Sequence, residues 1–181
     1  MTEHGAPERK YLRRETGLTV TDGRVIEGYA SLFGIKDQGG DTVRPGAYAA
    51  SLKRLGGRGE KVKMLWQHDP GQPIGVWDEV REDATGLWVK GRILTEVERG
   101  REAAALLAAG AIDGLSIGYR TVKAERDGKG HRLLSELELW EVSLVTFPML
   151  REARVAAKAD DTIWRDLAGL FENARRELAE R

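Results

Sequence analysis

Apolar and polar residues alternate along much of the chain, and this pattern predicts a protein built mainly of β-strands. Leu18–Thr21 and Val25–Leu32 alternate on either side of Asp22-Gly23, a dipeptide typical of tight hairpin turns. A turn at residues 127–130 is expected to join the last two strands. The remaining strands are predicted at residues 62–66, 74–80, 87–93, 115–123 and 133–145.

Two short helical segments interrupt these strands. Residues 47–55 follow Pro45-Gly46, and the glycine-rich residues 56–59 are expected to end that helix. Residues 96–109 are rich in alanine and leucine, and Gly110 is expected to cap them. A third, amphipathic helix is predicted near the C-terminus, where apolar residues recur at helical spacing: Ile163, Trp164, Leu167, Leu170, Phe171, Ala174 and Leu178.

These elements predict one mainly β domain with flanking helices, an α+β fold whose antiparallel strands close into a barrel or sandwich. The domain is expected to span residues 17–157. Residues 1–16 are charged and irregular and are expected to form a flexible leader, and residues 158–181 a separate helical tail. At 181 residues the chain is long enough for one substantial core but short for an α/β-hydrolase.

Composition excludes several kinds of site. The 29 basic and 29 acidic residues give zero net charge, so no large basic field points to nucleic acid. The absence of cysteine excludes disulfides, thiolate zinc sites and thiol nucleophiles. Three histidines make a multi-histidine metal site improbable, and we expect neither metal nor cofactor. No apolar run suits a signal peptide or a membrane span, so we expect a soluble intracellular protein.

Residues 114–118 read Gly-Leu-Ser-Ile-Gly and place Ser116 between two glycines, where little blocks an approaching substrate. The spacing G-x-S-x-G is that of the α/β-hydrolase nucleophile elbow, but in that fold the histidine follows both the serine and the acid. Here the best-placed histidine, His68, comes first. A serine near glycines is by itself more often a plain turn or strand residue, so Ser116 needs a base and an acid.

His68 is the first candidate base. It follows the strand predicted at residues 62–66 and precedes Asp69-Pro70, so it lies where a strand meets a loop, a common position for site residues. An exposed loop histidine with Asp69 as a local partner would give the same pattern. His131 is a weaker candidate, because it follows the turn at 127–130 at a hairpin end.

Glu141 is the candidate acid. Alternation along residues 133–145 places Glu141 on the same face as Leu137 and Leu139. A carboxylate on that apolar face is costly unless a donor such as an imidazole N–H satisfies it. A β-bulge near Trp140 would instead return Glu141 to solvent, and the pattern favours neither alternative.

Together these residues suggest a serine hydrolase. His68 would act as general base, Ser116 as nucleophile, and Glu141 would fix the orientation and tautomer of the imidazole. Two other features have simpler explanations. Gly39-Gly40-Asp41 is better explained as a turn than as a cation loop, and Arg151 as a surface arginine.

Several segments carry motifs in a fixed order: residues 28–34 (GYASLFG), Asp41 with 43–48 (VRPGAY), 65–69 (LWQHD), 73–75 (PIG), Gly110 with 114–119 (GLSIGY), and 141–145 (EVSLV) with Pro148-Met149. In these motifs and their order the chain resembles the prohead, or capsid maturation, serine proteases of tailed phages. That family is similar to herpesvirus assemblin. The resemblance covers about residues 17–157.

The resemblance implies a closed antiparallel β-barrel of the herpesvirus-protease type, edged by helices. It also implies a nucleophilic Ser116 and a base at His68. Where assemblin has a second histidine as the third member, this chain has Glu141. A carboxylate there agrees with the alternation of its strand.

Two sources are open for the group that would bind the oxyanion. One is the backbone N–H groups near Ile117 and Gly118, and the other is Arg151. The chain departs from many family members at residues 149–151 (MLR), because they have a small or amide residue after the methionine. This departure weakens an oxyanion role for Arg151.

The family acts inside immature capsids. The resemblance therefore implies a serine endopeptidase that cleaves scaffold protein or the N-terminal scaffold-like segment of the major capsid protein, and often itself. The implied partners are those proteins, with a homodimer as a further option and no nucleic acid or membrane. The implied location is the immature capsid in the cytoplasm of a bacterial host, of a phage, a prophage or a gene transfer particle. Two alternatives stay open: a non-enzymatic capsid assembly factor on the same fold, and a small-molecule acyl esterase.

Overall fold

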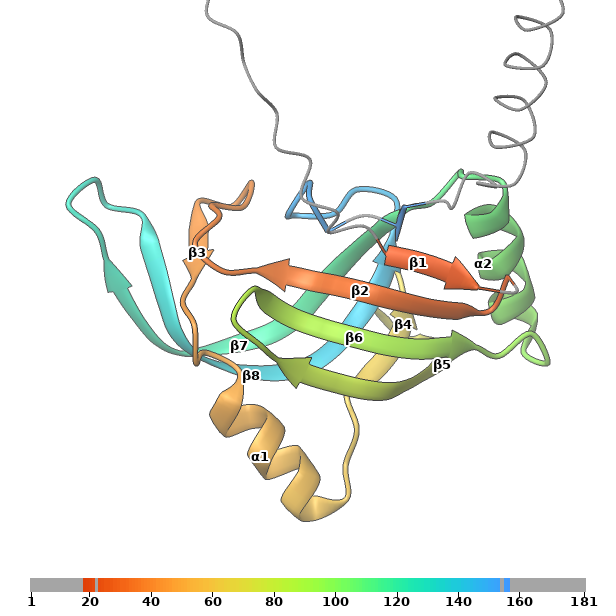
Figure 1. The fold of residues 1–181 in the computed structure, drawn as a ribbon, viewed down its shortest axis with the longest axis horizontal. Coiled ribbons are helices and arrows are strands. Elements are labelled where there is room, and N and C mark those ends of the chain that lie inside the picture. Colours follow the sequence, from red (N-terminus) through yellow and green to blue (C-terminus); the bar gives the residue numbers. More distant parts are fainter. Residues whose placement is uncertain (1–17, 22, 154, 157–181) are drawn as a thin grey trace, which may run out of the picture.

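The structure of the chain is a computed structural model that describes residues 18–21, 23–153 and 155–156. The leader predicted at residues 1–16 and the helical tail predicted at residues 158–181 lie outside the described residues. Within them the elements follow one another as labelled in Figure 1: β1 (Leu18–Thr21), β2 (Val25–Leu32), β3 (Asp41–Val43), α1 (Ala49–Arg58), β4 (Lys63–Trp66), β5 (Asp69–Glu82), β6 (Gly86–Ile93), α2 (Glu98–Ala108), β7 (Gly114–Arg126), β8 (Arg132–Val145) and β9 (Val155–Ala156).

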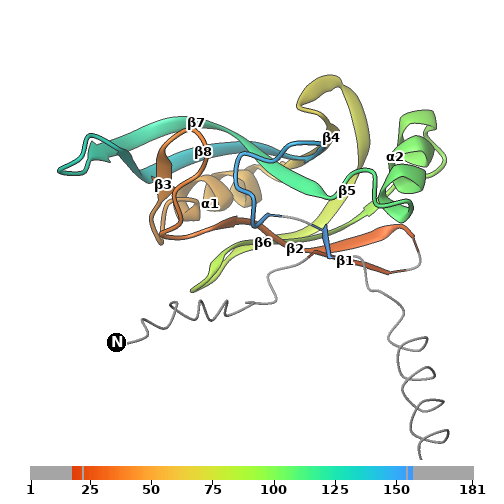
Figure 2. The ribbon, with the colours of Figure 1, turned by 90° about the horizontal axis from the view of Figure 1, so that it is seen from above.

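The described strands join into one sheet in the order β3-β8-β4-β5-β6-β2-β1-β9, and β7 pairs with β8. The sheet curls into a half-barrel, so that the β7–β8 hairpin lies across from β2 and β6 (Figures 1 and 2). The core fills the space enclosed by the curl. Its fully buried large side chains include Ile26, Met64, Ile74, Trp77, Leu87, Leu137 and Leu139.

The sheet is mixed, and the prediction of antiparallel strands is wrong for three pairs. β3 and β4 each pair with β8 in parallel, and β1 pairs with β9 in parallel. β3 and β4 lie along the same edge of β8, and α1, which packs on β8, connects them in the chain. The described strands form no ladder that closes on itself. Instead, the N–H of Leu115 on β7 donates to the C=O of Ala153 (2.8 Å), just before β9.

Most strands lie where alternation predicts them. β1 and β2 have the predicted bounds, and β4, β6, β7 and β8 differ from theirs by at most three residues at either end. β5 begins at Asp69 instead of residue 74, because a two-residue turn joins it directly to β4. β3 and β9 were not predicted, since three and two residues are too few to show alternation.

Helix α1 continues through two glycines that were expected to break it. Gly56 and Gly57 lie within its last turn, and the helix ends only at Gly59, whose φ of 67° places it in the left-handed region. The N–H of Gly59 donates to Gly56 (3.2 Å) and that of Glu60 to Leu55 (2.9 Å), which satisfies the final carbonyls. Gly110 caps α2 as predicted, with a φ of 69°. No helix of the described residues is long and apolar enough to cross a membrane.

Strand β8 lies between the strands that carry the candidate site residues, because it pairs with β4 on one edge and with β7 on the other. Ser143 lies opposite Ser116 of β7 and next to Leu65 of β4. Glu141 lies opposite Gly118 of β7. Strands that are distant in sequence therefore bring His68, Ser116 and Glu141 into one neighbourhood.

Candidate active site

His68 lies in the tight turn that joins β4 to β5. Gln67 and His68 are its two central residues, with φ values of 51° and 62°. Positive φ at both central positions is typical of a type I′ hairpin turn and is costly for residues other than glycine. The side chain of Gln67 secures the turn, because its Nε2 donates to Thr146 Oγ1 (2.8 Å) and its Oε1 accepts the Thr146 N–H (3.3 Å). The turn, with His68 in it, is thus held against the end of β8.

The imidazole of His68 contacts Glu141. Its Nδ1 lies 2.5 Å from Glu141 Oε1. The His68 side chain is 42% exposed and that of Glu141 only 10%. Glu141 therefore faces inward, one of the two alternatives that the pattern left open, although the strand register does shift at Trp140. Asp69, the alternative local partner, bonds instead to the N–H of Gly71 (2.8 Å) and to Nε2 of Gln72 (2.8 Å).

Ser143, which was not predicted as a site residue, completes the surroundings of the carboxylate. Its side chain is fully buried, and its Oγ donates to Glu141 Oε2. The same Oγ accepts the backbone N–H of His68 (3.3 Å). Ser143 thus links the backbone of the base to the carboxylate that holds its ring. Strand alternation could have found it, because Ser143 is two residues beyond Glu141 and shares its face.

Gly118 leaves the space in which Glu141 lies. A Cβ built on Gly118 would lie 2.0 Å from Glu141 Oε1 and 2.6 Å from its carboxyl carbon, far inside contact distance. Any side chain at this position would have to displace the carboxylate. The second glycine of the G-x-S-x-G motif thus leaves room for the acid on the neighbouring strand, a role that the motif alone does not predict.

Ser116 is 95% buried, with a relative exposure of 5%, and lies on β7 opposite Ser143. No hydrogen bond joins Ser116 to His68 in the part of the chain that the structure describes. Nucleophile–base contacts in unliganded hydrolases are often long and shorten when substrate binds. The structure therefore brings His68 and Glu141 into direct contact and places Ser116 on the neighbouring strand.

The other residues considered in the sequence do not take part in the contact between His68 and Glu141. His131 pairs with Asp127 (3.1 Å) in the β7–β8 turn. Gly40 has a φ of 85° in a turn closed by the Asp41 N–H to Asp37 Oδ1 (2.9 Å), as the turn interpretation of this loop predicts. Arg151 is exposed in the segment after β8. No group of three or more metal-ligating side chains is found among the described residues.

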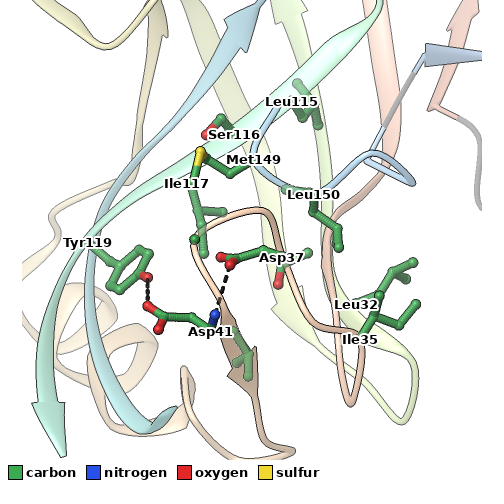
Figure 3. A pocket seen from close by; sticks show the side chains of 14 residues that line it. Leu32, Ile35, Asp37, Asp41, Leu115, Ser116, Ile117, Tyr119, Met149 and Leu150 are labelled. Carbon is green, nitrogen blue, oxygen red and sulfur yellow. Dashed lines mark hydrogen bonds between the residues drawn. The ribbon is translucent and has the colours of Figure 1, made fainter. Parts of the chain in front are cut away.

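A cavity of about 110 Å³ lies beside Ser116 (Figure 3). Its walls come from the end of β2, the loop before β3, β3 itself, the start of β7 and the segment after β8. Two carboxylates, of Asp37 and Asp41, face it among mostly apolar side chains. The apolar walls include Leu32, Ile35, Leu115, Ile117 and Leu150. The nucleophile candidate therefore adjoins a space that can hold part of a ligand.

The hydrogen bond to Glu141 raises the pKa of His68, and burial only partly opposes this. Because the pKa of His68 is higher in the folded protein than in the unfolded chain, its pair with Glu141 contributes its full stabilisation at pH values below the unfolded-state pKa of the histidine. That contribution is lost as the pH rises through the folded-state pKa. If His68 acts as a base, the same shift moves the acid limb of the activity profile to higher pH.

We expect Glu141→Gln to lower the pKa of His68, because a neutral amide stabilises the imidazolium less than a carboxylate does. The measurement is an NMR titration of the histidine ring protons in both proteins. His131, which pairs with Asp127 in a different turn, provides an internal reference within each spectrum. An unchanged midpoint for His68 would contradict the contact with Glu141.

Comparisons with known proteins identify the family of the chain. Residues 10–163 match the family model described as caudovirus prohead serine protease. The prohead protease of Enterobacteria phage HK97 is 32% identical over 149 residues, which cover 79% of this chain and 65% of that protein. The capsid polyprotein of Pseudomonas phage PAJU2 is 30% identical over 157 residues, which cover 82% of this chain and 22% of that protein. The chain thus spans less than two thirds of either relative.

The fold also has a solved counterpart. The structure of the bacteriophage T4 capsid assembly protease matches with a TM-score of 0.53 and 18% sequence identity. The match covers 67% of this chain and 80% of that one. At this identity the likeness concerns the fold, a mainly β architecture with few helices.

Proposed function

Because the chain belongs to the caudovirus prohead serine protease family, we propose that it is a serine endopeptidase with Ser116 as its nucleophile. The observation that carries the proposal is the contact between His68 Nδ1 and Glu141 Oε1 (2.5 Å), one strand away from Ser116. A histidine oriented by a buried carboxylate beside a buried serine is the arrangement that activates a hydroxyl for acyl transfer.

The contact with Glu141 determines which nitrogen of His68 acts. With Nδ1–H donating to Glu141, Nε2 carries the free lone pair. Nε2 takes the proton of Ser116 Oγ as the oxygen attacks the peptide carbonyl, and then delivers it to the departing amine. A water molecule, deprotonated by the same nitrogen, releases the acyl group and regenerates Ser116. Glu141 stays ionised and stabilises the imidazolium at each step.

The oxyanion has two candidate donors. The backbone N–H groups of Ile117 and Gly118 lie next to the nucleophile along β7 and need no side-chain movement. Arg151 is the alternative, from an exposed position after β8. We favour the backbone groups, because preorganised donors act without reorganisation during the reaction.

We further propose that the substrate is the major capsid protein or a scaffold protein inside the immature capsid, and that the chain also cleaves itself. The names of the similar proteins support this: a prohead protease, a capsid assembly protease and a capsid polyprotein. The match to the capsid polyprotein is especially informative, because in that protein a sequence similar to this chain forms 22% of a longer polypeptide that is named for the capsid.

The test is co-expression of the full chain with the major capsid protein of its own particle in bacterial cells. We expect mass spectrometry to find a capsid protein that has lost an N-terminal segment. The Ser116→Ala variant should leave it at full length. Ser135→Ala, which removes an exposed hydroxyl that donates to the Lys123 carbonyl (3.3 Å), should leave processing intact. Equal processing by Ser116→Ala would contradict the proposal and favour a non-enzymatic assembly factor.

A further inference from the structure

We propose that the cavity beside Ser116 binds the side chain of the substrate residue whose carbonyl is attacked, and that it selects a basic residue, lysine or arginine. This inference rests on the endopeptidase function proposed above and adds a substrate preference to it. Three features of the cavity carry it: its position, its apolar walls and its unbalanced negative charge.

The position of the cavity fits the acyl-side residue of a substrate. Ser116 is itself part of the lining, so a side chain in the cavity belongs to a residue next to the nucleophile. In the view of Figure 3, Ser116 lies at one end, Asp41 with Tyr119 at the other, and Asp37 between them. The apolar walls suit the aliphatic stem of a lysine or arginine, whose charged head would then reach the carboxylates.

The negative charge of the cavity is only partly compensated. Asp41 accepts a hydrogen bond from the Tyr119 hydroxyl (3.3 Å), and its other oxygen lies 3.5 Å from Nε of Arg132. Asp37 is half-buried, and its Oδ1 accepts the backbone N–H of Asp41 (2.9 Å). A bound basic side chain would add positive charge beside both carboxylates.

The effect of these carboxylates is visible at Tyr119. Burial, together with the negative charges of Asp41 and Asp37, raises the pKa of Tyr119 to about 12. Both carboxylates thus act on the same end of the cavity. A cation placed there would be stabilised by the field that disfavours a tyrosinate.

Asp37 is held in place before any ligand binds. Its backbone N–H donates to the Asp41 carbonyl (2.9 Å), and its Oδ1 accepts the Asp41 N–H (2.9 Å). The next residue, Gln38, is tied to the segment after β8: its N–H donates to the Met149 carbonyl (3.0 Å) and its Nε2 to the Pro148 carbonyl (3.1 Å). A fixed carboxylate binds a cation at a lower entropic cost than a mobile one.

The experiment uses the full chain and a peptide library made from a bacterial proteome, with cleavage sites identified by mass spectrometry. We expect lysine or arginine to be enriched on the acyl side of the cut bond. For the best sequence, two synthetic peptides are then compared, one with lysine and one with norleucine, which has the same stem without the amine. The ratio of their kcat/KM values measures the contribution of the charge, and a general loss of activity does not change it.

The Asp37→Asn variant should lower that ratio about 10- to 100-fold, the range expected for one charge-assisted hydrogen bond. Asparagine keeps the oxygen that accepts the Asp41 N–H, so the loop retains its bond. Asp78→Asn, on β5 and paired with Arg92 (3.3 Å), is the matched control and should leave the ratio unchanged.

The possible failures are distinguishable. Cleavage that depends on Ser116 but shows no basic preference would overturn this inference and leave the endopeptidase intact. An Asp37→Asn ratio equal to that of the wild type would do the same. No Ser116-dependent cleavage of any peptide would instead count against the proposed function.

Discussion

His68→Ala is expected to lower kcat/KM for peptide hydrolysis by about 10⁴- to 10⁶-fold, the loss seen when a serine protease loses its base. Without an imidazole, nothing in the proposed site can take the proton of Ser116 Oγ. The measurement is single-turnover hydrolysis of a cleavable peptide, together with the rate at which a fluorophosphonate probe modifies Ser116. Both should fall, because each requires the activated hydroxyl.

His131→Ala is the matched control. His131 resembles His68 in pairing through Nδ1 with a carboxylate near a β-turn, and its side chain has a similar exposure, 36% against 42%. It lies in the β7–β8 turn and not in the β4–β5 turn. We expect its removal to leave hydrolysis within about twofold of the wild type, as for a surface substitution of up to 0.5 kcal/mol. A loss of the same size in both variants would count against a base role for His68.

Gly118→Ala is expected to reduce kcat by about 10²- to 10⁴-fold while the protein stays folded. The new Cβ would lie 2.0 Å from Glu141 Oε1, so the carboxylate must move away from His68. The imidazole then loses the partner that fixes its tautomer, and misplacement by an ångström already costs about 10²-fold. Peptide hydrolysis and the unfolding midpoint, measured together, separate a displaced carboxylate from a disrupted fold.

Two variants sharpen this test. Gly56→Ala adds a Cβ in helix α1 where no atom lies within 4 Å, and we expect full activity from it. In the double variant Gly118→Ala/Glu141→Asp, the shorter side chain removes the two closest contacts, with Oε1 and the carboxyl carbon, and leaves the contact with Cγ (2.8 Å). It should recover part of the lost activity compared with Gly118→Ala. If it recovers none, Gly118 acts through something other than the space it leaves for Glu141.

Local pattern predicted much of the fold because most of the strands alternate over seven or more residues. The β1–β2 hairpin was found from its alternation and its Asp-Gly turn, whereas the parity of Glu141 with Leu139 left its inward face as one of two alternatives. Strand pairing was less accessible. The parallel contact of β4 with β8 joins segments more than 70 residues apart and leaves no periodic signal in either.

The residues of the candidate site also fall into two groups, those that the sequence suggested and those that depend on tertiary packing. Residue type and position in a strand suggested His68, Ser116 and Glu141. Ser143 followed from the same parity but was overlooked, because a serine in an apolar strand carries no signal of its own. Asp37 was out of reach, since its place in the cavity depends on how its loop packs against the segment after β8. The reason for Gly118 needed the cross-strand register with Glu141.

Because β8 pairs with both β4 and β7, it determines when the candidate site can form during synthesis of the chain. The ribosome releases the segment with His68 first and the one with Ser116 second, while Glu141 and Ser143 come 73 and 75 residues after the histidine. Until β8 has emerged, nothing aligns β4 with β7, and the imidazole has no carboxylate to orient it. In the proposed mechanism, the catalytic residues can therefore come together only after β8 has been synthesised and has paired with β4 and β7.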